Sequence, residues 1–228
     1  MRGSSLLWRL SGMFLSIRKL RLGDQLMTTS EASKRLTDLL VIRNSIPGLN
    51  TFTEYDLSLL WLRMKQQGMD RWIFCSGEVQ TYDAFKTLML SNDTWTYAGY
   101  SHITGEPCAL GIFDRMLGKT VHLHYTFFRN EEAIRDKEKY AKALFDLVFE
   151  NKTVDCILML TPHCFRHSNS FARSVGAELV GYIPSAIAIK NEETGELMYG
   201  EDALYKVVSP FYHKHNIQMK RRSRHGIR

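Results

Sequence analysis

Closely spaced histidines are the residues of this chain best suited to proton transfer. His122 and His124 lie two residues apart in a segment with strand-like character, so both imidazoles should project from one face of a strand. His163 and His167, with Cys164 between them, follow a second apolar run. A neutral imidazole accepts a proton near neutral pH and can act as a general base toward an amine. His122 and His124 are therefore the candidate catalytic residues.

The same side chains allow two other interpretations. Four imidazoles and the Cys164 thiol are ligand types that hold transition metals, but their spacing matches no zinc motif, and no metal site is predicted. They can also be separate histidines without a joint role. Glu106 and Asp114 are further polar candidates, and solvation of a hairpin accounts for acids at such positions. Phosphate-binding loops, dinucleotide-binding glycine motifs and metalloprotease signatures are absent from the sequence.

The first ninety residues predict mainly helices. Ser30 is a good N-cap for a helix that continues to about Ile42. Thr53 and Asp56 resemble a capping box, and Gly68 is a plausible end for the helix that follows. Between this helix and another predicted over residues 81–90, the apolar residues 72–75 are interpreted as a short strand.

The remainder predicts an antiparallel meander followed by strands that alternate with helices. A long helix with an apolar stripe separates the meander from a buried strand, which is typical of a strand–helix–strand crossover. The sequence thus favours a mixed sheet of the α/β or α+β class. The predicted elements are strands at 94–100, 109–114 and 120–128, a helix at 131–151, a strand at 154–160, a helix at 168–175, and strands at 179–189 and 205–208.

This order of elements resembles that of the GNAT (Gcn5-related N-acetyltransferase) fold, in which helices cover both faces of a mixed central sheet. Residues 109–114 are similar to the third strand of that family, and residues 157–162 to its fifth strand. Residues 171–184 resemble its closing helix, glycine and strand, with Ala177 where phenylalanine is usual.

The resemblance implies acetyl-CoA as cofactor, held in a wedge where the fourth and fifth strands separate. Its pyrophosphate would lie at the N-terminus of the crossover helix, where free N–H groups and the helix dipole favour an anion. The residues that the resemblance assigns to cofactor binding are Tyr125, Phe127, Arg129, Asn130 and Arg135.

Two positions depart from the family pattern. Residues 128–136 contain no glycine where the family has a glycine-rich loop, and three acids stand in the same stretch. Ala172 occupies the position of the tyrosine that often protonates the departing thiolate. Both departures are typical of a scaffold that has lost catalysis.

The charge distribution divides the 228 residues into three parts. Residues 1–27 carry a net charge of +4 and read as a basic leader, and residues 213–228 carry +6 and read as a basic tail. Since the whole chain has +6, the predicted domain at 28–212 has about −4. Basic ends on an acidic body suit nucleic acid or an acidic partner.

Three functions follow as hypotheses, the third being simple nucleic-acid binding through residues 220–224. The first is a GNAT-like N-acetyltransferase that transfers the acetyl group of acetyl-CoA to an amine. The second is a catalytically silent GNAT-like assembly protein, similar to head-assembly proteins of short-tailed phages, that docks on virion proteins or nucleic acid through its basic ends. No transmembrane segment is predicted, and the four cysteines suggest no disulfide framework. The expected location is therefore the cytoplasm. If the chain is phage-encoded, it is the host cytoplasm or the virion.

Overall fold

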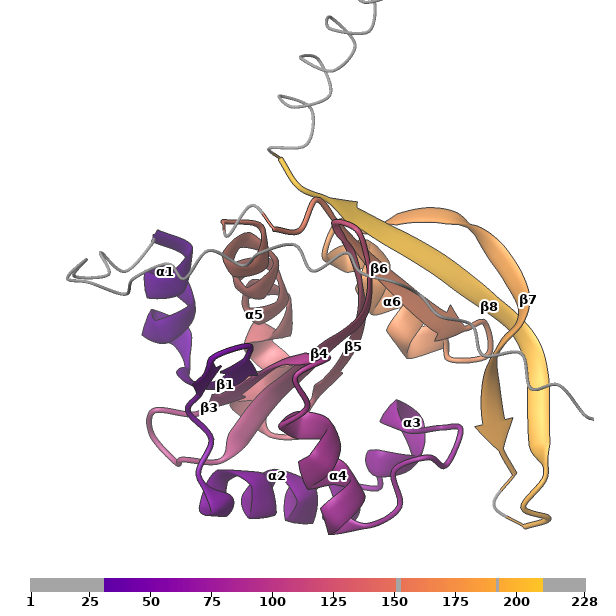
Figure 1. The fold of residues 1–228 in the computed structure, drawn as a ribbon, viewed down its shortest axis with the longest axis horizontal. Helices are drawn as coiled ribbons and strands as arrows, with labels where there is room; N and C mark the ends of the chain where they lie inside the picture. Colours follow the sequence, from indigo (N-terminus) through magenta and orange to yellow (C-terminus); the bar gives the residue numbers. More distant parts are fainter. Residues whose placement is uncertain (1–30, 151–152, 192, 211–228) are drawn as a thin grey trace, which may run out of the picture.

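A computed structural model describes residues 31–150, 153–191 and 193–210 (Figure 1). The leader predicted at 1–27 and the tail predicted at 213–228 lie outside the described residues. Fourteen elements follow one another along the described chain: α1 (Glu31–Leu39), β1 (Val41–Ile46), β2 (Leu49–Asn50), α2 (Glu54–Gln66), α3 (Asp70–Ile73), α4 (Tyr82–Met89), β3 (Trp95–Tyr100), β4 (Pro107–Leu117), β5 (Thr120–Phe127), α5 (Glu131–Glu150), β6 (Cys156–Pro162), α6 (Arg166–Ser174), β7 (Glu178–Lys190) and β8 (Leu197–Val208).

The strands form one eight-stranded sheet in the order β2-β1-β3-β4-β5-β6-β8-β7. Every neighbouring pair is antiparallel except β5 and β6, which are parallel and joined by the crossover helix α5. The predicted mixed sheet and strand–helix–strand crossover are confirmed. β7 and β8 form a long hairpin that extends past the rest of the sheet (Figure 1).

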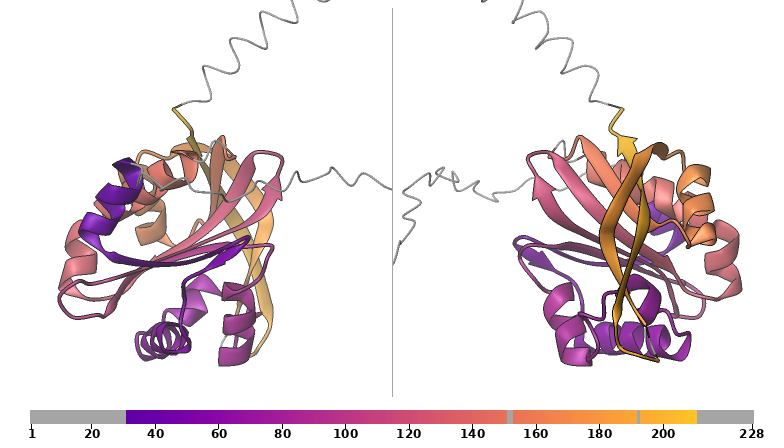
Figure 2. Two further views of the ribbon diagram at one scale, coloured as in Figure 1. Left: turned by 60° about the vertical axis from the view of Figure 1, so that its left-hand side comes forward. Right: turned by 90° about the vertical axis from the view of Figure 1, so that its right-hand side faces the viewer.

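Helices cover both faces of the sheet (Figure 2). α5 and α6 pack on one face, and α1 lies beside α5. α2 and α4 pack on the opposite face. Because side chains alternate along a strand, β4 contributes Phe113 to the first core and Ile112 to the second. Among the described residues, no helix has the length and apolar character to cross a membrane.

Two local sequence signals act as predicted, and a third helix cap was not predicted. Thr53 and Asp56 form a reciprocal capping box at the start of α2. Gly68 follows the C-cap of that helix with φ +62°, a left-handed conformation that favours glycine. Thr81 caps α4 by accepting a hydrogen bond from the Ala84 amide.

Three predicted elements differ from the structure, one of them the last strand, which was expected at 205–208 and begins at Leu197. The helix expected to continue to Ile42 ends at Leu39, and residues 41–46 pair with β3 as a strand. The strand expected at residues 72–75 is wrong, because residues 70–73 form the single-turn helix α3. A short apolar run fits either structure, and here the Phe74 amide donates to the Asp70 carbonyl and closes a helical turn.

The parallel ladder between β5 and β6 is short. Its register comprises Thr120 with Cys156, Val121 with Ile157 and His122 with Leu158. Both strands continue beyond these pairs, β5 to residue 127 and β6 to residue 162. The two strands therefore separate toward their C-terminal ends, as the predicted wedge requires.

Gly99 of β3 lies against Leu40, the residue between α1 and β1, and this contact leads to a testable prediction. A Cβ at this position would lie 2.3 Å from Cδ1 of Leu40, a side chain that is only 1% exposed. We expect Gly99→Ala to destabilise the protein by about 1–3 kcal/mol through overpacking, measured by urea unfolding. Gly181→Ala is the matched control, because a Cβ there meets nothing within 4 Å; it should change stability by less than about 0.5 kcal/mol. Equal stabilities for the two variants would contradict this account.

A bidentate ion pair ties α2 to the β3–β4 turn and generates a second prediction. Nε and Nη2 of Arg63 each donate a hydrogen bond of 2.6 Å to the Glu106 carboxylate. These hydrogen bonds lower the pKa of Glu106. A depressed pKa in the folded state contributes stability above the unfolded pKa and loses it as pH falls. Glu106→Gln should therefore lose less than about 1 kcal/mol at pH 7. The difference from the native protein should begin to shrink as the pH falls through about 4.3, the unfolded pKa, and vanish only below the lowered pKa of the folded state. Urea unfolding at several pH values tests this, with Glu193→Gln in the exposed β7–β8 turn as control.

Candidate functional site

A carboxylate and two imidazoles converge on the sheet face that carries α2 and α4. Oδ1 of Asp114 lies 3.1 Å from Nδ1 of His122, and Oδ2 lies 3.3 Å from Nε2 of His124. The two imidazole rings meet edge to face with their centroids 4.4 Å apart. Asp114 comes from β4 and both histidines come from β5, so the cluster spans two neighbouring strands.

A β-bulge brings Asp114 to this face. The β4–β5 register places Leu117 opposite Thr120 and Asp114 opposite His122, which is three residues along β4 for two along β5. Without the extra residue, position 115 would lie opposite His122, and Asp114 would face the other side of the sheet. The bulge therefore assembles the cluster.

Partial burial gives the cluster its electrostatic character. The side chain of His122 is 12% exposed, that of Asp114 21% and that of His124 34%. Burial would raise the pKa of Asp114, but the hydrogen bonds from His122 and His124 and their charges outweigh it and hold this pKa well below its usual range. Asp114 is thus a carboxylate that orients two imidazoles, of which His124 is the more accessible.

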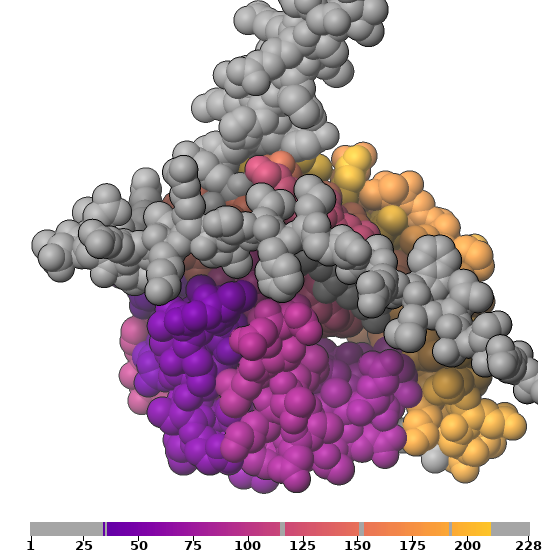
Figure 3. All heavy atoms as spheres, viewed as in Figure 1, coloured from indigo at the N-terminus to yellow at the C-terminus, as the bar shows by residue number. Residues whose placement is uncertain are grey.

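The cluster opens into a cavity of about 370 Å³. Its walls are the α3–α4 segment on one side and the β7–β8 hairpin on the other, and Figure 3 shows an opening between these two parts of the surface. Leu160 of β6 lines the same cavity, since it lies beyond the last pair of the β5–β6 ladder. Glu78 and Asp114 are its acids, and its lining contains no lysine or arginine, so the cavity favours a cation.

A second groove, of about 590 Å³, lies at the C-terminal ends of β5 and β6. Arg129 follows β5, and Arg166 opens α6, so two guanidinium groups line this groove together with His167 and Cys164. Trp72 of α3 contacts Phe165 at one wall, with ring centroids 5.0 Å apart. This groove has the cations that an anionic ligand needs.

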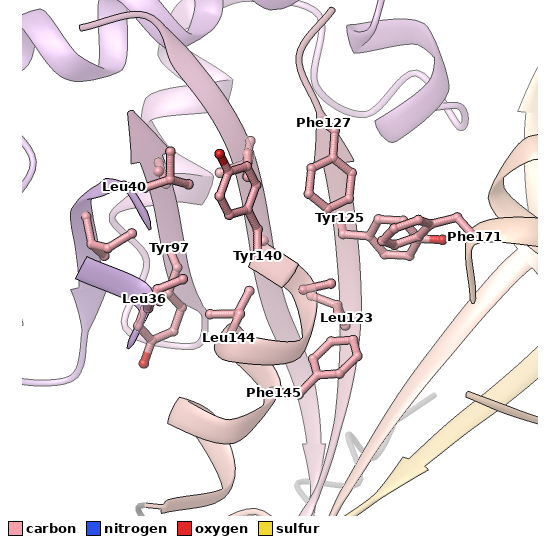
Figure 4. Close-up of a pocket in the computed structure, with 17 residues that line it drawn as sticks. Leu36, Leu40, Tyr97, Leu123, Tyr125, Phe127, Tyr140, Leu144, Phe145 and Phe171 are labelled. Carbon is pink, nitrogen blue, oxygen red and sulfur yellow. The ribbon is translucent and has the colours of Figure 1, made fainter. Parts of the chain in front are cut away.

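Tyr125 and Phe127 project from the opposite face of β5. Both rings pack against Phe171 of α6 with centroids 5.0 Å apart (Figure 4). The Tyr125 hydroxyl donates to the Ser168 carbonyl, and burial raises the pKa of Tyr125. Only a cavity of about 30 Å³ remains between these rings and α5. Period-two alternation thus separates these two assigned cofactor residues from His122 and His124.

The other residues assigned to the cofactor surround the start of α5. Asn130 caps this helix: its Oδ1 accepts from the Ala133 amide at 2.7 Å, and its Nδ2 donates to the Pro107 carbonyl at 2.9 Å. Arg135 is exposed and pairs with Asp136 at 2.7 Å. Of the five assigned residues, Arg129 and Phe127 line the groove at the strand ends.

The two groups of histidines do not share a cavity. His167 and Cys164 line the groove that contains Arg129. His163 instead lies near the β7–β8 hairpin, where its Nδ1 is 3.6 Å from a carboxylate oxygen of Glu201. Among the described residues, the group that could hold a metal ion is formed by His122 and His124 with Asp114.

Sequence reasoning treated Asp114 as part of a hairpin and assigned no role to Arg166 or Trp72. Counting the register back from the turn at 117–120 would place Asp114 on the face away from the histidines, because the ladder gains one residue between 114 and 117. The sequence offered one signal for Arg166. Pro162 ends the apolar run of β6, and the helix that follows begins at Arg166.

A buried amide holds the β6–α6 loop and generates a prediction. Nδ2 of Asn169 donates to the Pro162 and Phe165 carbonyls at 3.0 and 2.9 Å, and its Oδ1 accepts from the Tyr205 hydroxyl at 3.1 Å. Asn169→Ala should destabilise the protein by about 1–3 kcal/mol in urea unfolding, because the buried Tyr205 hydroxyl loses its acceptor. Tyr205→Phe keeps both amide donor bonds and should lose less. If Asn169→Ala is as stable as the native protein, the amide does not hold the loop.

Comparison with solved structures shows that the chain has a GNAT-like fold, as predicted. Spermidine N-acetyltransferase from Vibrio cholerae in complex with CoA and spermine has a TM-score of 0.60 and 9% identity, over 77% of this chain and 99% of that one. An acetyltransferase of the GNAT family from Bacillus anthracis has a TM-score of 0.55 and 14% identity, over 75% and 95%. Microcin C7 self-immunity acetyltransferase, in complex with acetyl-CoA and AMP, has a TM-score of 0.56 and 14% identity, over 70% and 91%.

Identities this low establish a shared fold and nothing finer. No protein-family profile matches the sequence, and no curated protein matches it. The alternative role in virion assembly is tested by none of these comparisons and stays a prediction.

Proposed function

We propose that this chain is an N-acetyltransferase that transfers the acetyl group of acetyl-CoA to a small cationic amine. One observation carries the proposal: β5 and β6 separate just where a carboxylate-oriented imidazole pair faces a cavity without lysine or arginine. The fold supports it, since the solved structures of similar fold include acetyltransferases.

The described residues fit acetyl-CoA at the strand ends. Arg129 and Arg166 line the groove there, and guanidinium groups bind phosphate oxygens well. The N-terminus of α5 lies next to Arg129 and adds the positive end of its dipole, although Asn130 already binds the Ala133 amide and Glu131 and Glu132 oppose an anion. When bound, this cofactor supplies an acetyl group activated as a thioester.

The chain itself would supply orientation, a base and charge stabilisation. Glu78 and Asp114 attract the ammonium form of the amine into the cavity. The bound ammonium would first release one proton to solvent, because a nitrogen without a lone pair cannot attack. Nδ1 of His124, the ring nitrogen that does not face Asp114, would then accept the second proton as the amine nitrogen bonds to the acetyl carbon, while Asp114 holds the Nε2–H and stabilises the imidazolium. His122 is the second candidate base.

Backbone amides can stabilise the negative charge that develops on the carbonyl oxygen. Beyond His122 and Leu158 the facing edges of β5 and β6 share no ladder, so N–H groups on these edges are available to a ligand between them. Ala172 stands at the position of the family's tyrosine, so as the C–S bond breaks the proton needed by the departing thiolate would come from water, and the imidazolium would return its proton to the hydroxide that remains. For each ammonium ion and each acetyl-CoA consumed, the reaction yields one acetamide, one free thiol and one proton.

Turnover of acetyl-CoA with spermidine and spermine tests the proposal through release of free thiol and the mass of the acetylated amine. His124→Ala and Asp114→Asn should lower kcat/KM about 10²–10⁴-fold, since general base catalysis contributes that much. His102→Ala is the matched control, because this exposed histidine lies in the β3–β4 turn and bonds the Thr37 carbonyl. It should retain full activity.

Calorimetric titration with acetyl-CoA separates binding from chemistry. Saturable binding that weakens in Arg129→Ala and Arg166→Ala would support the assigned groove. Folded protein that produces no heat at high ligand concentration, and no acetylated amine, would overturn the proposed function.

A further inference from the structure

We infer that Asp114, His122 and His124 form a binding site for a divalent transition metal, with zinc as the best-fitting ion. The two nitrogens and the carboxylate are contributed by two adjacent strands, and their ligand atoms all lie within 4.8 Å of one another. Two imidazoles and one carboxylate are a donor set used by both catalytic zinc sites and non-haem iron sites.

The donor atoms of the three residues lie close enough to converge on one metal ion. In tetrahedral coordination with bonds of about 2.0–2.1 Å, neighbouring donor atoms lie roughly 3.3–3.4 Å apart. Oδ1 of Asp114 lies 3.1 Å from Nδ1 of His122, Oδ2 lies 3.3 Å from Nε2 of His124, and the ligand atoms of the three residues all lie within 4.8 Å of one another. The three groups would draw together from within 4.8 Å to bind one ion, the imidazoles exchanging their hydrogen bonds to Asp114 for bonds to the metal.

The framework around the cluster holds these donors in place. The rings lie on one face of β5 two residues apart, and the bulge in β4 fixes Asp114 opposite His122. All three side chains are partly buried, so little side-chain freedom is lost on binding. This rigidity distinguishes the cluster from a chance group of exposed side chains.

The remaining coordination position would face the cavity of about 370 Å³, which has room for water or a small ligand. Three protein ligands with an open position are the pattern of a catalytic rather than a structural zinc site. Magnesium and calcium prefer oxygen ligands and should not compete, because two of the three donors are imidazole nitrogens.

Metal binding would regulate acetyl transfer. A neutral imidazole has one nitrogen with a free lone pair, so when Nε2 of His124 binds zinc the ring proton must be on Nδ1 and the ring can no longer act as a base. Zinc should therefore inhibit turnover at the concentrations that fill the site. This consequence rests on the proposed function, whereas the metal site itself does not.

Cobalt and zinc titrations of the metal-free, full-length protein test the site without acetyl-CoA. We expect one equivalent of Co²⁺ with the intense visible absorption of tetrahedral cobalt, displaced by Zn²⁺ and unaffected by excess Mg²⁺. His124→Ala and Asp114→Ala should each weaken binding at least about a hundredfold, since even changes to residues that only support ligands cost 10–100-fold. His122→Ala is less informative, because this more buried side chain also contributes to folding.

Two control variants identify the histidines responsible. His102→Ala removes an exposed histidine outside the cluster. His213→Ala combined with His215→Ala removes the other pair with the spacing of His122 and His124. Both should bind cobalt like the native protein.

The possible results test the metal site and the proposed function separately. An absent tetrahedral spectrum, loss of binding in either control, or less than about tenfold weakening in folded His124→Ala and Asp114→Ala would overturn the metal site. A metal site with no acetylation activity would overturn the proposed function alone, and activity without metal binding would leave that function intact.

Discussion

The short parallel ladder between β5 and β6 is the constraint on which the rest of the structure depends. Three residue pairs join a five-stranded antiparallel half to the three strands β6, β8 and β7. A longer ladder would close the gap between the strand ends, and a missing one would leave the halves held by helices alone. Because pairing stops at His122, His124 and Leu160 reach the same cavity from different halves of the sheet.

Because side chains alternate along β5, its two faces have different roles. Leu123, Tyr125 and Phe127 face α5 and α6 and hold those helices on the sheet. His122 and His124 face α3 and α4 and remain accessible to small molecules. A change on one face therefore affects packing, and a change on the other affects chemistry, although the residues are adjacent in sequence.

Much of the fold was predictable because the determining interactions are local. The Thr53 capping box, the left-handed Gly68 and the amphipathic stripe of α5 each need only neighbouring residues. The errors arose where distant contacts decide: Val41 and Ile42 join a strand by pairing with β3, and α3 packs Trp72 on Phe165. The pair of histidines was visible in the sequence, but Asp114 joins them through a bulge that no local pattern announces.

A single buried carboxyl group shapes the outer wall of the cavity. Asp202 of β8 is 1% exposed, and its Oδ2 accepts from the Ala186 and Ile187 amides, where β7 carries two extra residues and Ser185 has a φ of +54°. The same bulge brings Ala186, Ile187 and Ala188 to the cavity. Access to the histidines is thus governed by a kink in an edge hairpin rather than by the strands that carry them. Evolution can therefore retune which molecules enter by altering hairpin length or bulge position, while the reactive cluster stays unchanged.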